Sequence, residues 1–220
     1  MIDWGWIADH LDDIAYLTLQ HLVLTAIPLA AGFVISLALA IWAVRRPVVY
    51  GPITAVTGVL YTIPSLAAFA LLVPVFGFSL LAAFIPLTTY TLLILFRNIV
   101  AGFEAVPREV LEAADGMGYR GRDRLLRVEI PLAVPLMIAG LRLAAVTLIG
   151  LATVASILGS SFGGLGQLIT EGLQTLFPTK YVLGAVLSVL LAFAVDFAFV
   201  RLERRATPWA RARAAEAVPA

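Results

Sequence analysis

Long apolar runs alternate with short polar segments along most of the chain, and this pattern predicts membrane-spanning helices. A spanning helix needs about 20 mostly apolar residues. Five stretches come near that length: residues 17–44, 53–76, 79–96, 132–158 and 181–200. Prolines lie within the second and third stretches, where neighbouring helices can satisfy the carbonyl groups that a proline frees. We therefore expect an all-α integral membrane protein with about five transmembrane helices, forming a single domain over residues 1–220.

The composition supports a membrane protein and excludes several kinds of site. The 220 residues are 61% hydrophobic and only 13% charged, whereas a soluble domain is nearer half apolar and a quarter charged. The chain has no cysteine, which excludes disulfides and thiolate metal sites. His10 and His21 stand apart from any cluster of metal ligands. The start of the chain is acidic rather than basic, so we expect no cleavable signal peptide.

Arginine residues gather in three polar segments. These segments follow the first span, separate the third span from the fourth, and follow the fifth: Arg45 and Arg46; Arg97, Arg108, Arg120, Arg122, Arg124 and Arg127; Arg201, Arg204, Arg205, Arg211 and Arg213. With five spans, all three segments fall on one side of the membrane, and the other side receives only Lys180. The excess of positive charge marks the cytoplasmic side. We therefore expect the N-terminus outside an inner or plasma membrane and the C-terminus in the cytoplasm.

Residues 159–179 are too rich in glycine and polar residues to span the membrane. Their apolar residues recur near helical spacing, at Leu165, Leu168, Ile169, Leu173 and Leu176. This segment is expected to be a short interfacial or re-entrant helix, or a loop.

The polar segment of residues 104–131 predicts two short helices with a break between them. Pro107 suits the first turn of a helix, and residues 108–114 have helical propensity. Gly116 and Gly118 interrupt that pattern, residues 120–128 resume it, and Pro131 precedes the fourth span. A second interpretation is that the arginines only fix the topology and contact anionic headgroups.

The same segment resembles the EAA loop of permease subunits in bacterial ABC importers. That pattern reads Glu-Ala-Ala, three residues, Gly, nine residues, Ile, one residue, Leu-Pro. This chain has the spacing throughout, with two apolar substitutions: Glu112, Ala113, Ala114, Gly118, Val128, Ile130 and Pro131. The resemblance implies the fold of a type I ABC importer permease and a coupling helix that docks on a cytoplasmic ATPase dimer. It assigns that contact to Glu112, Ala113, Ala114, Gly118 and Pro131.

Shorter matches resemble the permeases for quaternary amines, namely glycine betaine, carnitine, choline and proline betaine. Residues 61–67 read Tyr-Thr-Ile-Pro-Ser-Leu-Ala, and residues 95–98, 162–166 and 196–204 also resemble that subfamily. Pro64 beside Ser65 predicts an irregular helix, which either lines a cavity or packs as a kink. Together with Tyr61, these residues are our candidates for the translocation path.

Asp196 is a carboxylate within the fifth span, which is by default a candidate functional site. It lies five residues before Arg201, so a structural role near the cytoplasmic face, by pairing or by extending to the interface, is favoured. Arg142 is a similar case at the start of the fourth span.

The chain contains no Gly-x-x-x-x-Gly-Lys-Ser/Thr sequence, so we expect no P-loop and no enzymatic activity. ATP and Mg²⁺ are expected on a separate ATPase subunit, with no cofactor or metal in this chain. Five spans are too few to enclose a translocation path within one chain, so we expect a second permease subunit, identical or homologous. We also expect an extracellular substrate-binding protein, and we expect no nucleic-acid partner. The alternatives are a permease for another small solute such as an amino acid, an ion-coupled secondary transporter, a membrane scaffold or a membrane enzyme.

Overall fold

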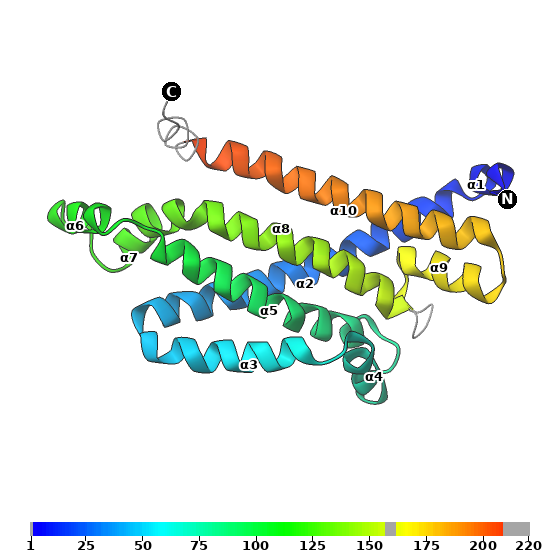
Figure 1. The fold of residues 1–220 in the computed structure, drawn as a ribbon, viewed down its shortest axis with the longest axis horizontal. Helices are drawn as coiled ribbons and strands as arrows, with labels where there is room; N and C mark the ends of the chain where they lie inside the picture. Colours follow the sequence, from blue (N-terminus) through cyan, green and yellow to red (C-terminus); the bar gives the residue numbers. More distant parts are fainter. Residues whose placement is uncertain (1, 157–161, 209–220) are drawn as a thin grey trace, which may run out of the picture.

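The computed structural model describes residues 2–156 and 162–208, and four long helices in these ranges lie roughly side by side (Figure 1). They are α2 (Leu11–Arg45), α5 (Leu80–Glu104), α8 (Ile130–Ala155) and α10 (Pro178–Ala206). At about 1.5 Å per residue, the shortest of them reaches about 38 Å, more than the 30 Å hydrocarbon core of a bilayer. Within the described residues, each of the four is also apolar enough to cross a membrane.

Shorter elements connect the long helices and occupy both ends of the bundle. They are α1 (Trp4–Asp9), η1 (Pro47–Val49), α3 (Tyr50–Thr62), α4 (Ser65–Phe76), α6 (Arg108–Gly116), α7 (Arg122–Arg124), η2 (Leu125–Glu129) and α9 (Leu165–Gln174). In Figure 1, α6, α7 and the last turn of α10 lie at one end, and α1 and α9 lie at the other. The turn from α2 into α3 also lies at the first end. The described parts of the three arginine-rich segments are thus gathered at one end.

The centre of the bundle is formed where α5 packs between α2 and α8. Glycines allow the close approach of these helices. A Cβ atom added at Gly102 of α5 would lie 2.9 Å from the carbonyl oxygen of Ala133 in α8. One added at Gly140 of α8 would lie 2.7 Å from Cβ of Asn98 in α5. In contrast, α10 packs loosely, since only 6% of its most apolar 18 residues are buried, against 44% for α5.

The second expected span, residues 53–76, is two helices rather than one. The helix breaks at this point because Pro64 has no N–H to continue it and restricts the residue before it. α3 and α4 meet at 88°. Ile63 accordingly takes an extended conformation, with φ −62° and ψ 127°. The hydroxyl of Tyr90 donates a hydrogen bond to the carbonyl oxygen of Ile63. α3 alone, 13 residues long, is about 20 Å and too short to cross the hydrocarbon core.

Residues 159–179 were expected to form either a short helix or a loop. The structure has a helix there, α9. α2 and α10 extend beyond their expected bounds at both ends, and α8 begins two residues early, at Ile130. α5 continues to Glu104 where an end near Phe96 was expected. Residues 157–158 of the expected fourth span, residues 159–161 and the tail 209–220 lie outside the described residues.

Candidate coupling surface and translocation path

α6 contains the Glu-Ala-Ala sequence and ends in a well-formed C-cap. The N–H of Gly118 donates to the carbonyl of Asp115, and the N–H of Tyr119 donates to the carbonyl of Ala114, both at 3.0 Å. These two bonds are those of a Schellman motif, which needs a positive φ at the residue after the cap. Gly118 has φ +89°. The predicted break is therefore a glycine turn that stops α6 and satisfies its last carbonyl groups.

The predicted coupling residues divide between two faces of α6. Ala114 is buried at 1% exposure against the rest of the chain, whereas Glu112, Ala113 and Gly118 are exposed. Pro131 lies apart from them, in the first turn of α8. The exposed residues form a surface at the end of the bundle that a soluble partner could contact. Their role in coupling stays a prediction.

Arg124 joins α6 to the helical segment that leads into α8. Its Nε donates to Oε1 of Glu129 at 2.8 Å, and its Nη1 donates to both carboxylate oxygens of Asp115 at 2.8 and 3.0 Å. Asp115 belongs to α6 and Glu129 to η2. We call these three residues the Arg124 clip. The clip therefore ties α6 to the helical segment that continues into α8.

The clip depends on η2, which is a π-helical turn. In an α-helix, residues five apart lie about 140° apart around the axis, so Arg124 and Glu129 would point in different directions. The π turn brings them to the same side, and its i→i+5 bond joins the N–H of Ile130 to the carbonyl of Leu125. Pro131 follows directly and has no N–H for the carbonyl of Arg127. Helical patterning does not predict this pairing, because residues five apart do not form a helical pair.

Tyr61, Pro64 and Ser65 lie around the break between α3 and α4. The ring of Tyr61 stands edge-on to the ring of Tyr90 in α5, with centroids 6.0 Å apart. Pro64 is exposed and Ser65 is half-buried. The structure thus brings the three residues to one corner beside α5, and their place on a translocation path stays a prediction.

Arg142 and Asp196 form an ion pair between α8 and α10. The guanidinium donates from Nε to Oδ1 at 2.9 Å and from Nη2 to Oδ2 at 3.1 Å. Glu203 lies 3.8 Å from the Nη1 atom of Arg142. The structural pairing expected for Asp196 is present, but Arg142 lies near the middle of α8 rather than at the start of a span.

The glycine-rich segment before α9 is fixed by α2. The buried ring of His21 accepts a hydrogen bond at Nδ1 from the N–H of Leu165, at 3.2 Å, and its Nε2 bonds to the carbonyl of Ile149, at 3.0 Å. Gly164 has φ +78°, and a Cβ atom there would lie 3.0 Å from Nδ1 of His21. His21 therefore joins α2, α8 and α9. Its isolation in the sequence concealed this role.

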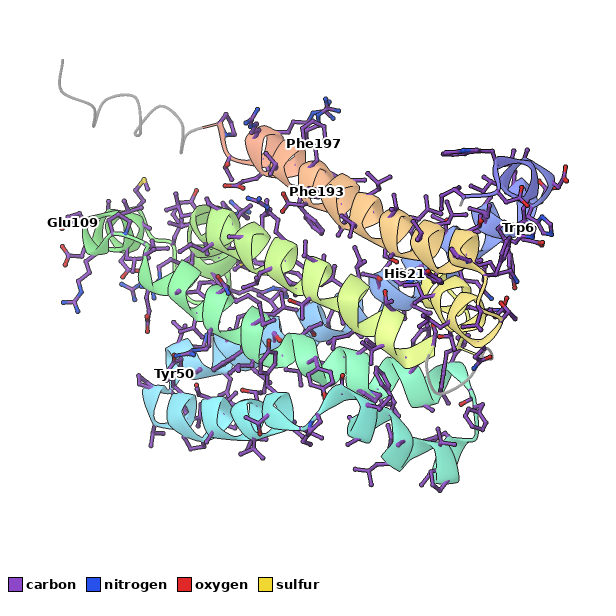
Figure 2. All side chains as sticks on the ribbon, turned by 45° about the vertical axis from the view of Figure 1, so that its right-hand side comes forward. Trp6, His21, Tyr50, Glu109, Phe193 and Phe197 are labelled. Carbon is purple, nitrogen blue, oxygen red and sulfur yellow. The ribbon has the colours of Figure 1, made fainter. Side chains whose placement is uncertain are left out.

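The opposite end of the bundle has a polar hollow of about 380 Å³ between α1, α2, α9 and α10. Trp6 stacks on His10 at 4.3 Å, and the ammonium of Lys180 lies 5.5 Å from the Trp6 ring centroid. Figure 2 shows Trp6 at this end and Glu109 of α6 at the other. Glu171 of α9 pairs with Lys180 at 2.9 Å. In the described part of the chain, no three His, Cys, Asp or Glu side chains are grouped to hold a metal ion.

Comparison with known proteins gives one consistent result. The family described as "Binding-protein-dependent transport system inner membrane component" matches residues 18–208. The chain is 34% identical over 196 residues to the glycine betaine/carnitine/choline transport system permease protein OpuCB of Bacillus subtilis, covering 89% of each protein. It is 37% identical over 199 residues to the carnitine transport permease protein OpuCB of Listeria monocytogenes, covering 90% of each.

A solved structure agrees with these relatives. The inward-facing MetNI methionine ABC transporter contains a chain that matches with a TM-score of 0.77 and 25% identity. The match covers 88% of this chain and 96% of that one.

Proposed function

The chain belongs to the family of binding-protein-dependent transport system inner membrane components, and we propose that it is the permease subunit of an ATP-driven importer of quaternary-amine osmoprotectants. The expected fold, an all-α type I ABC importer permease, is confirmed by the MetNI likeness. The observation that supports the substrate class best is the relatedness to glycine betaine, carnitine and choline permeases over about nine-tenths of the chain.

The layout of the two ends supports the partners that we propose. A cytoplasmic ATPase dimer docks on the exposed residues of α6, at the arginine-rich end of the bundle. That end faces the cytoplasm because positively charged segments are retained there. ATP and Mg²⁺ are bound by the ATPase, and a substrate-binding protein docks at the end that contains α1 and α9. A second permease subunit completes the path, which a chain of four or five spans is too small to enclose.

The coupling step is carried by rigid contacts. Closure of the ATPase dimer moves α6, the Arg124 clip moves α8 with it, and the tight contact of α8 with α5 at Gly102 and Gly140 moves the centre of the bundle. Movement of packed helices as rigid elements is an ordinary route for opening and closing a site.

Reconstituted vesicles test this function. The permease is purified with its ATPase and binding protein, and uptake of labelled glycine betaine is measured with and without ATP, at low and high salt. We expect uptake that requires ATP and rises with salt. Uptake that follows a proton or sodium gradient without ATP would favour the ion-coupled alternative. Uptake of an amino acid but of no quaternary amine would favour a permease for another solute.

A further inference from the structure

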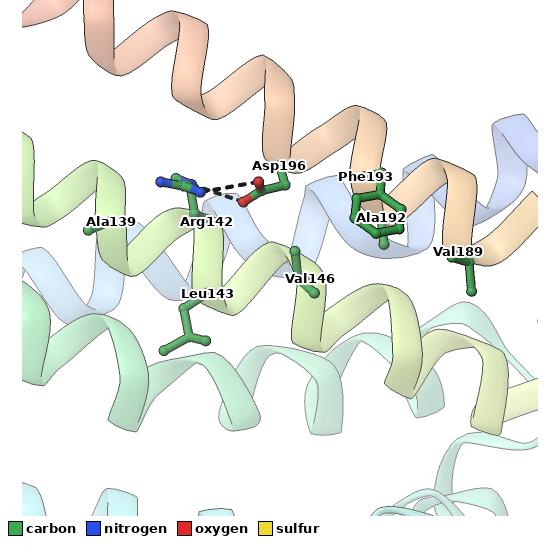
Figure 3. Close-up of a pocket in the computed structure, with 8 residues that line it drawn as sticks. All are labelled: Ala139, Arg142, Leu143, Val146, Val189, Ala192, Phe193 and Asp196. Carbon is green, nitrogen blue, oxygen red and sulfur yellow. Dashed lines mark hydrogen bonds and ion pairs between the residues drawn. The ribbon is translucent and has the colours of Figure 1, made fainter.

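A groove between α8 and α10 contains an ion pair among apolar side chains (Figure 3). Arg142 and Asp196 face each other across it, and the ring of Phe193 lies about one turn along α10 from Asp196. Leu143 and Val146 of α8 complete the nearby wall. The groove has a volume of about 480 Å³, within the range of roughly 300–1,000 Å³ that is common for small-molecule sites.

The groove cannot face lipid without cost. The side chains of Arg142 and Asp196 are 33% and 36% exposed, although both helices cross the membrane. Charged side chains in such helices almost always face a water-filled cavity or other protein. No described part of this chain covers the groove, and Phe193 is 70% exposed. The open side of the groove therefore faces water or the second permease subunit.

We propose that this groove is a station on the substrate path that binds a zwitterion with a carboxylate and a quaternary ammonium group. This inference rests on the proposed function and assigns residues to its substrate. The Arg142 guanidinium takes the carboxylate, because its planar fork matches two carboxylate oxygens. The Asp196 carboxylate and the face of the Phe193 ring take the quaternary ammonium, which aromatic rings attract through their negative face.

The ion pair makes this exchange feasible. In the empty state, Arg142 and Asp196 neutralise each other. In the occupied state, each pairs with one end of the substrate, so neither charge is left unpaired. Glu203, at 3.8 Å from Arg142, keeps the guanidinium in place when Asp196 turns to the substrate. Because one set of ion pairs replaces another, binding is weak, as a transport path requires for release.

Choline provides a way to tell this station from a purely structural pair. Choline has the quaternary ammonium but no carboxylate, so it engages Asp196 and Phe193 without Arg142. A pair that only holds α8 against α10 would make no distinction between choline and a betaine. The contact with Arg142 is thus expected to matter only for the carboxylated substrates.

A single-cysteine label tests the station directly, since the natural chain has no cysteine. Val146→Cys is made in the full complex with ATPase and binding protein, and its reaction with a charged, water-soluble thiol reagent is timed. Val56→Cys is the matched control, because Val56 of α3 is 61% exposed in a groove lined by apolar and uncharged side chains. We expect Val146→Cys to react and Val56→Cys to stay largely unlabelled. Glycine betaine and choline should each slow the labelling of Val146→Cys at least about fivefold.

Arg142→Gln is then added to Val146→Cys. We expect protection by glycine betaine to be lost and protection by choline to be retained. The proposal is overturned by an unreactive Val146→Cys, by equal labelling of Val56→Cys, by labelling without protection, or by betaine protection that survives Arg142→Gln. ATP-dependent betaine uptake by the complex with the unaltered permease chain is measured in parallel vesicles. Its absence would refute the proposed function, whereas uptake with unprotected Val146→Cys would refute the station alone.

Discussion

Replacing Arg124 by glutamine should loosen α6 without unfolding the bundle. The change removes three charged hydrogen bonds, two to Asp115 and one to Glu129. The Asp115 side chain is 46% exposed, so its share is below about 1 kcal/mol, as for exposed ion pairs. Glu129 is only 14% exposed, and a hydrogen bond to a charged group in such a place contributes about 1.5 kcal/mol. A total of about 1–2 kcal/mol changes a local opening equilibrium by about 5–30-fold.

Hydrogen–deuterium exchange measures that opening. Amides of α6 should exchange about 5–30-fold faster in Arg124→Gln, while those at the centre of α5 should be unchanged. In the assembled importer, less substrate should be taken up per ATP hydrolysed, because α6 moves without α8. Arg122→Gln is the matched control, since Arg122 is exposed and lies two residues earlier in the same short helix. Unchanged exchange in α6, or an equal effect of Arg122→Gln, would refute the role of the clip.

Three further changes test other features. Gly118→Val should weaken ATPase co-purification and uptake, because a positive φ costs a β-branched residue about 1–3 kcal/mol. Gly118→Asn should have a milder effect, and equal losses in the two variants would show that the positive φ is not the cause. Gly102→Ala should lower the midpoint of thermal unfolding in detergent by a cost of about 1–3 kcal/mol, because its Cβ would meet the Ala133 carbonyl at 2.9 Å. Gly58→Ala, with open space around its Cβ, is its control, and an equal loss there would count against close packing. Burial alone would raise the pKa of Glu171, but the hydrogen bond from Gln167 and the Lys180 ammonium outweigh it, so this pKa is lowered. That stabilisation is complete above the ordinary glutamate pKa and is lost as pH falls below about 4. Glu171→Gln should therefore flatten the acid side of a plot of unfolding midpoint against pH. Parallel plots for the variant and the natural chain would contradict this role of Glu171.

The family and the long helices could be predicted from the sequence because both depend on local pattern. A run of apolar residues long enough to cross a bilayer has few other stable structures. The spacing of Glu112, Gly118 and Pro131 is likewise a local signal, and the family it resembles is confirmed. The Schellman cap at Gly118 follows from the same short stretch. The coupling and path residues themselves stay predictions.

Contacts between distant segments could not be predicted from the pattern of hydrophobic and polar residues. The proline at position 64 signalled an irregularity, but the 88° angle between α3 and α4 depends on packing against α5. His21 looked isolated because its partners lie 128 and 144 residues away. The pairing of Arg142 with Asp196 had a signal, namely opposite charges in apolar runs, but their relative depth depends on how α8 and α10 align.

The loose packing of α10 has a consequence for biogenesis. A helix that buries so little of itself, with a charged pair open on one flank, is stable in the bilayer only when something else shields that flank. Permease chains synthesised in excess of their assembly partners should therefore be short-lived, with α10 as the feature that membrane proteases recognise. Matched expression of the subunits would then matter as much to the cell as the activity of the finished complex.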